Sequence, residues 1–220
     1  MKPSVLIGVV IVFLIPIVAL VVTHSSNPST VTASPSPSPT PTNYTVPADA
    51  VSATKVTLQT DKGNITLDLF PDTAPLAVRN FVTLGKRGYY NGTFFHRILQ
   101  TFMIQGGDPT GTGTGGQSIY GQGFATELGS RKFTAGSLGM ARTADPNSNG
   151  SQFFIVTEGP QTQLDGQYTL FGQVDDAASM AVVTAIAATP TTCGAQSCDS
   201  GAEQSVPTQQ IHITGFQIIQ

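Results

Sequence analysis

The stretch FFHRILQTFMIQGGD, residues 94–108, places one arginine, Arg97, among large apolar side chains. Only ten of the 220 residues are Lys or Arg, and charged residues make up 10 % of the chain. An average soluble domain has roughly 25 %. A guanidinium in this setting is either structural, in an ion pair or with its stem packed on the surface and its head in water, or functional. Motifs elsewhere in the sequence distinguish between these two interpretations.

From about residue 51 the chain has the pattern of a mainly β domain with two helices. Residues 55–60 and 64–70 alternate apolar and polar side chains around a turn, which predicts a β-hairpin. Residues 75–84 have helical spacing, with Thr73 as the cap and Gly85 as the stop, and residues 175–187 predict a second helix. Further strands are expected in FFHRI, FMIQG, SLGMA, FFIVT, YTLFGQV and HITGFQII. Many short strands with two helices favour an antiparallel barrel or sandwich.

Several common functional classes have no support in the sequence. The glycine-rich run at 111–116 fits G-x-G-x-x-G, but turn-like sequence follows it and the lysine of a phosphate-binding loop is missing. The G-x-S-x-G signature of serine hydrolases is absent, and the three histidines are far apart. Metal-assisted and histidine-based catalysis are therefore not expected. With a net charge of -3 and a pI near 5.4, no basic field favours binding to nucleic acid.

Six stretches occur in the order of a known family: FFHRI, FMIQGGD, GTGGQSIYG, GSLGMA, PNSNGSQFFI and LDGQYTLFG. On these motifs the chain resembles the cyclophilins, the cyclosporin-binding family of peptidyl-prolyl isomerases, from about residue 55 to residue 220. The resemblance implies a closed eight-stranded antiparallel β-barrel capped by two α-helices, with the active site on the outer face of the barrel. It also implies an enzyme that uses no metal and no cofactor, and whose substrates are proline-containing polypeptides.

The resemblance assigns roles to individual residues. The catalytic arginine of the family falls on Arg97, and Gln105 matches the glutamine that steadies it. The apolar matches correspond to the walls of a proline pocket and to the strand beside a bound peptide, and Gln152 matches a substrate contact. The implied substrate-binding residues are Phe102, Met103, Met140, Ala141, Gln152, Phe154, Leu164 and Tyr168.

The chain departs from the family pattern in three places. Gln163 stands where the best-known members have a tryptophan associated with cyclosporin binding, so we expect cyclosporin to bind weakly. Tyr168 replaces a histidine, and its ring can still pack on the pocket. The segment MARTADPNSNG carries one extra residue, so the backbone group that holds the substrate carbonyl belongs to either Arg142 or Thr143.

The N-terminal segment predicts a membrane anchor. Residues 5–22 carry no charge, and a helix of that length spans about 27 Å, close to the roughly 30 Å hydrocarbon core. No A-x-A site follows the run, which favours an uncleaved anchor over residues 1–24 above a cleaved signal peptide or a buried helix. Lys2 precedes the run and no cation follows it closely, which places the N-terminus in the cytoplasm and the remainder outside.

Residues 25–50 predict a disordered linker between this anchor and the domain at 51–220. Proline alternates with Ser or Thr over residues 34–42, which favours extended polyproline II and a stalk-like role over a ligand for a proline-recognising module. We therefore expect a membrane-anchored protein with its catalytic domain on the extracytoplasmic side. The alternative is secretion after signal cleavage.

Cys193 and Cys198 are disulfide candidates. Four residues separate them in a polar segment, and outside the cytoplasm such a pair is expected to close a short loop. A metal site would need two further ligands, which nothing adjacent supplies. Redox catalysis usually has two intervening residues between its cysteines.

Two functions follow from this sequence. The favoured one is a monomeric peptidyl-prolyl isomerase that acts on exported polypeptides as a folding catalyst. The alternative is a module that binds proline peptides with weak or irrelevant isomerase activity, because Gln163 and Tyr168 alter the rim of the pocket.

Overall fold

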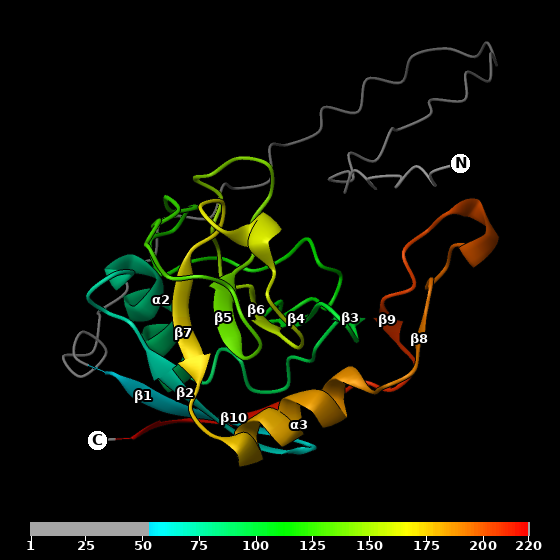
Figure 1. The fold of residues 1–220 in the computed structure, drawn as a ribbon, viewed down its shortest axis with the longest axis horizontal. Helices are drawn as coiled ribbons and strands as arrows, with labels where there is room; N and C mark the ends of the chain where they lie inside the picture. Colours follow the sequence, from blue (N-terminus) through cyan, green and yellow to red (C-terminus); the bar gives the residue numbers. More distant parts are fainter. Residues whose placement is uncertain (1–52, 220) are drawn as a thin grey trace, which may run out of the picture. The chain divides into compact units, whose positions relative to one another are not determined.

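The computed structural model describes residues 53–219 (Figure 1). The expected anchor at 1–24 and linker at 25–50 lie outside these residues, as do the first two residues of the expected domain. Across the part of the chain that is described, no helix combines the length and the apolar character needed to cross a bilayer.

One antiparallel sheet of eight strands organises the domain, in the spatial order β10-β1-β2-β7-β5-β6-β4-β3. Its strands are β1 (Lys55–Thr60), β2 (Gly63–Leu69), β3 (Arg97–Leu99), β4 (Met103–Gly106), β5 (Ser137–Met140), β6 (Phe153–Val156), β7 (Leu170–Val174) and β10 (Ile213–Ile219). Each strand overlaps a stretch that predicted one. The predicted hairpin is present as β1 and β2, with Leu58 opposite Ile65.

The sheet is an open, curled half-barrel, so the prediction of a closed barrel is wrong. The edge strands β3 and β10 do not pair with each other in the described sheet. The segment that precedes β3 meets the start of β10, where the Ile213 N–H donates to the Thr93 carbonyl at 2.8 Å and the Phe95 N–H donates to the Ile211 carbonyl at 3.1 Å. The outer edge of β3 is occupied by another segment, because the Ile98 N–H donates to the Ser205 carbonyl at 2.8 Å.

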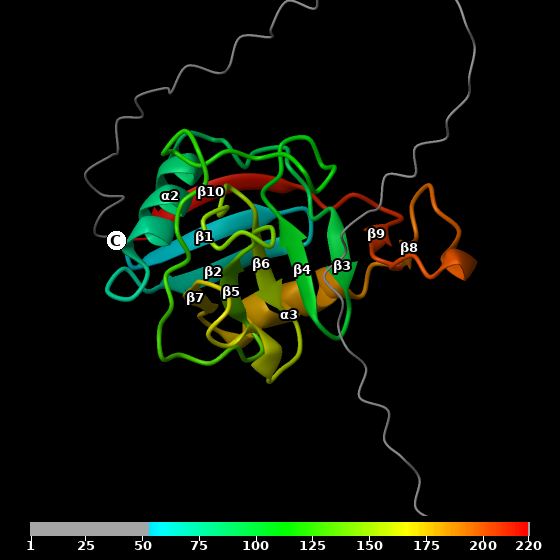
Figure 2. The ribbon, with the colours of Figure 1, turned by 90° about the horizontal axis from the view of Figure 1, so that it is seen from above.

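A small hairpin that the sequence did not predict supplies this segment. It consists of two short strands, β8 (Thr191–Thr192) and β9 (Val206–Pro207), and a single turn of 3-10 helix, η2 (Cys198–Ser200). Two perpendicular views place β9 beside β3 (Figures 1 and 2). The hairpin therefore extends the open edge of the sheet.

The two predicted helices are present as α2 (Pro75–Lys86) and α3 (Ala177–Ala187). Asp176 caps α3, since its side chain accepts from the Ser179 N–H. Thr73 does not cap α2. The carboxylate of Glu127, about 50 residues further along the chain, instead accepts from two backbone N–H groups in the first turn of α2, at 2.9 Å each. A carboxylate there also interacts favourably with the helix dipole.

Gly85 does not stop α2, and the helix continues to Lys86. Glycine is needed here for close packing, because a Cβ atom at Gly85 would collide with the ring of Phe216. The close approach of a β10 side chain therefore explains this glycine.

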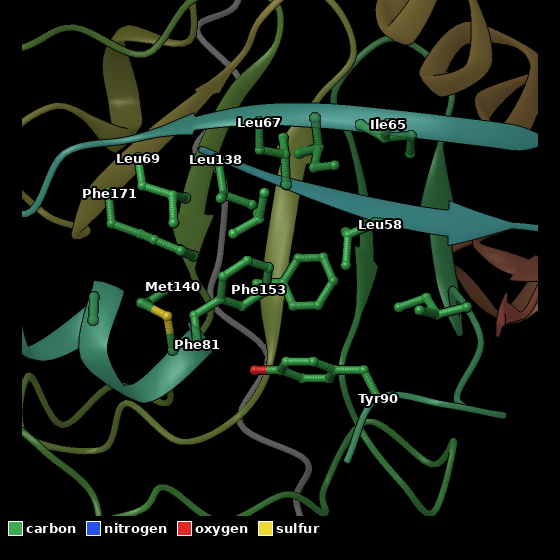
Figure 3. Packing of buried hydrophobic residues seen from close by; sticks show 14 of the residues in the cluster. Leu58, Ile65, Leu67, Leu69, Phe81, Tyr90, Leu138, Met140, Phe153 and Phe171 are labelled. Carbon is green, nitrogen blue, oxygen red and sulfur yellow. The ribbon is translucent and has the colours of Figure 1, made fainter. Parts of the chain in front are cut away.

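The main core lies between α2 and the curled sheet (Figure 3). Phe81 of α2 is completely buried, and its ring centroid lies 5.2–5.3 Å from those of Tyr90, Phe153 and Phe171. Edge-to-face and tilted pairs of this kind add about 0.5–1.5 kcal/mol each beyond the area they bury. The aromatic cluster thus ties α2 to β6 and β7.

A pair of Leu→Ala substitutions tests this assignment of the core. Leu84 in α2 is 1 % exposed and Leu128 is 59 % exposed. Because truncation of a buried leucine leaves a cavity, Leu84→Ala should lower the free energy of unfolding by about 2–5 kcal/mol. Leu128→Ala should change it by less than about 0.5 kcal/mol. Urea denaturation followed by circular dichroism measures both, and equal losses would contradict the fold.

Candidate active site

Side-chain alternation gives the sheet a second apolar cluster apart from the main core. Phe153 packs in the main core, whereas Phe154, the next residue of β6, belongs to the second cluster. The buried members of the second cluster are Met103, Phe133, Phe154, Val156, Leu164 and Leu170. Among the partly buried residues packed against it are Phe102, Ala141 and Tyr168. Most of the predicted pocket residues therefore gather here.

The side chains of this cluster are closely packed. Met103 is 2 % exposed, and Phe154 and Leu164 are 5 % exposed. The rings of Phe133 and Phe154 stack with centroids 5.8 Å apart, and Tyr168 meets Phe154 edge-on at 6.0 Å. Phe133 was not predicted as a pocket residue, since no motif in the sequence singles it out.

Met140 does not join these residues. Its side chain is fully buried in the main core, so a peptide beside this strand would meet the backbone of Met140 and not its side chain. The substrate role of the strand stays a prediction. The reason is again alternation: Met140 pairs with Phe153 in the ladder between β5 and β6, and both residues point to the core. Ala141 packs against the second cluster as expected.

Arg97 lies next to the second cluster because of the pairing between β3 and β4. In that ladder Arg97 is directly opposite Gln105, and its Nη1 donates to the Gln105 Oε1 at 3.3 Å. The Sδ atom of Met103 lies 3.9 Å from the same nitrogen. Arg97 and Gln105 are therefore neighbours, as the motif resemblance implied.

Glu203 is a member of this site that the sequence did not reveal. Arg97 Nε donates to Glu203 Oε1 at 2.6 Å, and Nη2 donates to Oε2 at 2.7 Å, which is a bidentate ion pair. Both side chains are 32 % exposed. The hydrogen bond from Arg97 holds the pKa of Glu203 below its ordinary value of 4.5. Arg97 therefore forms an ion pair, as its structural interpretation expected, and it also lies next to the second cluster.

A chain of hydrogen bonds between amide groups continues from Arg97 to the glycine-rich loop. Gln105 Nε2 donates to Gln152 Oε1 at 2.8 Å. Gln152 Nε2 in turn donates to the carbonyls of Gly113 and Gly115, at 3.0 and 2.8 Å. These contacts fix the orientation of Gln105 and, through it, that of the guanidinium.

The glycine-rich loop folds around a carboxylate of the chain itself. Asp108 is buried and accepts from the N–H groups of Thr110, Gly113 and Gly115 at 2.8, 2.7 and 3.1 Å. Burial alone would raise the pKa of Asp108, but these hydrogen bonds outweigh it and lower the pKa below 3.8. The run at 111–116 is therefore a structural loop beside the site.

Three further residues named from the sequence are not members of the second cluster. Gln163 is exposed on a 3-10 helix, η1 (Thr162–Leu164), and its Nε2 donates to Gln161 Oε1 at 2.7 Å. Cys193 and Cys198 form a disulfide within the hairpin, with an S–S distance of 2.14 Å. Among residues 53–219 there is no group of three or more His, Cys, Asp or Glu side chains that could hold a metal ion.

Comparison with known proteins agrees with this geometry. The model of the family described as "Cyclophilin type peptidyl-prolyl cis-trans isomerase/CLD" matches residues 55–218, well over half of the chain. The chain belongs to the cyclophilin family. This cyclophilin is therefore a peptidyl-prolyl cis-trans isomerase.

Several proteins resemble this cyclophilin. "Peptidyl-prolyl cis-trans isomerase-like 1" of Neurospora crassa is 51 % identical over 141 residues, which cover 63 % of this chain and 84 % of that protein. The human protein of the same name is 55 % identical over 131 residues, which cover 59 % and 78 % of the two chains. A crystal structure of a cyclophilin type peptidyl-prolyl cis-trans isomerase from Cryptosporidium parvum matches with a TM-score of 0.68 and 35 % identity, covering 76 % and 98 %.

A second structure of the Cryptosporidium parvum protein was determined in the presence of the dipeptide ala-pro. It matches this cyclophilin with a TM-score of 0.66 and 36 % identity, and it covers 76 % of this chain and 99 % of that chain.

The role of Asp108 can be tested by Asp108→Asn. A neutral amide replaces a carboxylate that accepts several hydrogen bonds, so the free energy of unfolding should fall by about 1–3 kcal/mol at pH 7. Because the folded pKa is lowered, the contribution of Asp108 is complete above its ordinary pKa of 3.8 and is lost as the pH falls through the folded value. The difference between wild type and Asp108→Asn should therefore shrink at pH 3. A difference that stays the same in urea denaturation at pH 7 and pH 3 would contradict this account.

Proposed function

We propose that this cyclophilin accelerates rotation about X-Pro bonds in exported polypeptides, with Arg97 as its electrostatic catalyst. One observation carries the proposal: the guanidinium of Arg97 lies beside the closely packed second cluster and is oriented by Gln105. A charged donor next to an apolar pocket is the arrangement that binding and twisting a prolyl bond requires.

The chemistry explains why an arginine suits this position. Rotation about a peptide bond faces a barrier near 20 kcal/mol because it breaks amide resonance, and X-Pro bonds isomerise over tens to hundreds of seconds. Twisting localises the lone pair on the proline nitrogen, which becomes pyramidal. A donor aimed at that nitrogen stabilises the twisted state and has little to bind in the planar state, so it lowers the barrier. Arg97 remains protonated at any physiological pH.

The second cluster supplies the other half of the mechanism. We propose that the pyrrolidine ring is held by Phe102, Met103, Phe154 and Leu164 while the carbonyl side of the bond rotates. Apolar walls exclude water, and a low dielectric strengthens the interaction between Arg97 and the twisted amide. We place Tyr168 at the rim of this pocket and Gln152 as a polar contact for the peptide.

The backbone group that receives the substrate carbonyl is assigned to Arg142. The Thr143 N–H donates to Ser148 Oγ at 2.9 Å, so it is already used. The Arg142 N–H has no acceptor among the described residues. The side chain of Arg142 is also anchored, with its guanidinium carbon 4.6 Å from the centroid of the Tyr168 ring and a bond from Nη2 to the Gln167 carbonyl.

The proposed setting is extracytoplasmic. The uncharged run at 5–22 supports an anchor, the Pro-rich linker supports a stalk, and a disulfide between Cys193 and Cys198 suits an oxidising compartment. Fractionation of cells that produce the full chain should place it in the membrane pellet, with the domain open to protease added outside. Recovery from the cytosolic fraction would contradict this setting, and recovery from the medium would favour signal cleavage.

Substitution of Arg97 tests the catalytic proposal. Loss of a donor aimed at the transition state typically costs roughly 100- to 1000-fold in rate. Arg97→Ala in the full chain should therefore lose most of kcat/KM in a stopped-flow assay of a proline peptide, while its circular dichroism spectrum stays that of wild type. Lys62→Ala is the control, because Lys62 is an exposed cation in the turn between β1 and β2. Wild-type activity in Arg97→Ala would overturn the mechanism.

The same assay separates the alternative function and the expected inhibitor response. If wild type and Arg97→Ala both bind the peptide but neither exceeds the background rate, the site is a docking module for proline peptides. Because Gln163 is a polar side chain in place of the family tryptophan, cyclosporin should inhibit only weakly. A monomer is expected in size-exclusion chromatography of the detergent-solubilised chain.

A further inference from the structure

Two side chains hold the guanidinium of Arg97 from opposite sides of β3. Gln105 reaches it from β4, the strand paired with β3. Glu203 reaches it from the other side, where the hairpin of β8 and β9 lies along the outer edge of β3 (Figure 2). Arg97 is thus bracketed between a strand of the sheet and a segment that lies outside the sheet.

The position of Glu203 is set by the hydrogen bonds of its neighbours in the hairpin. Two residues further on, Ser205 is 7 % exposed and its carbonyl accepts from the Ile98 N–H at 2.8 Å. The preceding and following parts of the hairpin are joined by the pairing of β8 with β9, and Gln204 Nε2 donates to the Thr191 carbonyl at 2.7 Å. The Cys193–Cys198 disulfide closes the outer part of the same hairpin. The backbone that carries the Glu203 carboxylate to Arg97 is therefore held in place by these contacts.

The hydrogen bonds of Arg97 leave part of its donor capacity open. A guanidinium has five N–H donors. Glu203 takes the one on Nε and one on Nη2, and Gln105 takes one on Nη1. The second hydrogen on Nη1 has only the weak acceptor Met103 Sδ, and the second on Nη2 has no acceptor among the described residues. The outer edge is thus held less strongly than the inner edge, and the second hydrogen on Nη2 is available to a substrate.

Glu203 also has the negative charge needed to hold a guanidinium. Its hydrogen bond from Arg97 lowers its pKa, so the carboxylate is ionised at neutral pH. A bidentate contact fixes both the position and the plane of a guanidinium. Without it, Arg97 would keep one 3.3 Å bond to Gln105 and would regain most of the rotamer freedom of a long side chain.

We propose that Glu203 is a positioning residue for the isomerase reaction, which holds the inner edge of the Arg97 guanidinium so that the outer edge faces the prolyl bond. This inference rests on the catalytic role proposed for Arg97. It assigns a function to the hairpin as well, because the hairpin is the structure that carries the carboxylate to β3.

Kinetics of Glu203 variants in the full chain test the proposal. Misplacement of a catalytic group costs up to about a hundredfold, so Glu203→Ala should lower kcat roughly ten- to hundredfold with little change in KM for a proline peptide. Glu203→Gln keeps the length of the side chain and one acceptor oxygen, and should recover part of the loss. Glu158→Ala is the matched control, because Glu158 is exposed and its side chain has no hydrogen bond or ion pair within residues 53–219.

A spectroscopic measurement separates positioning from a purely structural effect. The chain has five arginines, so the Nε–H resonance of Arg97 can be assigned in a ¹⁵N spectrum by its loss in Arg97→Lys. In wild type this proton should exchange slowly with water because it is bonded to Glu203. In Glu203→Ala the resonance should shift or vanish through fast exchange, while the backbone amide spectrum away from the hairpin stays unchanged.

Three results would overturn the inference. The first is wild-type kcat and KM in Glu203→Ala. The second is a rise in kcat/KM, which would mean that Glu203 competes with the substrate for Arg97. The third is additive losses in the double variant Arg97→Ala/Glu203→Ala, because a residue that acts through Arg97 has nothing to add once Arg97 is gone. Full activity in Arg97→Ala alone would instead contradict the proposed catalytic role of Arg97, whatever Glu203 does.

Discussion

The alternation of side chains along β4 and β6 underlies both the stability and the site of this cyclophilin. In these two strands, Ile104 and Phe153 point to the main core, while Met103, Gln105 and Phe154 belong to the side where the site lies. A shift of one residue in the pairing of β4 with β6 would exchange the two sets. The buried aromatic cluster under α2 opposes such a shift, so the packing that stabilises the fold also keeps the pocket in register.

Because the chain has few charged residues, the contacts of each buried or half-buried charged side chain indicate how the site is held together. Asp108 accepts hydrogen bonds from N–H groups of its own loop, so the glycine-rich run has a fixed structure beside the site. Arg97 is balanced by Glu203 and Gln105, and Gln105 is tied to that loop through Gln152. One connected polar network thus runs along the apolar pocket, and every member has a partner that limits its orientation.

The open edge of the sheet has a consequence for this network. If β3 were paired with β10 in a closed barrel, its outer side would be occupied by a strand of the sheet. Here the hairpin of β8 and β9 lies against that side, joined by the bond from Ile98 to Ser205. A segment outside the sheet can carry a charged side chain to Arg97 without any change in the strands that form the pocket. The departure from a closed barrel and the ion pair of Arg97 are two aspects of one arrangement.

Local sequence determined much of this protein. Turn residues and alternation predicted the first hairpin, helical spacing predicted α2 and α3, and short motifs located Arg97, Gln105 and the apolar residues of the pocket, because these patterns act over a few residues. Tertiary structure alone decided which groups met from far apart in the chain. Glu203 lies 106 residues from Arg97, and Glu127 lies 51 residues from the helix turn that it caps. Neither carboxylate has a spacing that marks it, since its partner is set by the way strands and loops pack in three dimensions. The same is true of the open barrel, because whether two edge strands pair depends on which segments pack against those edges in three dimensions.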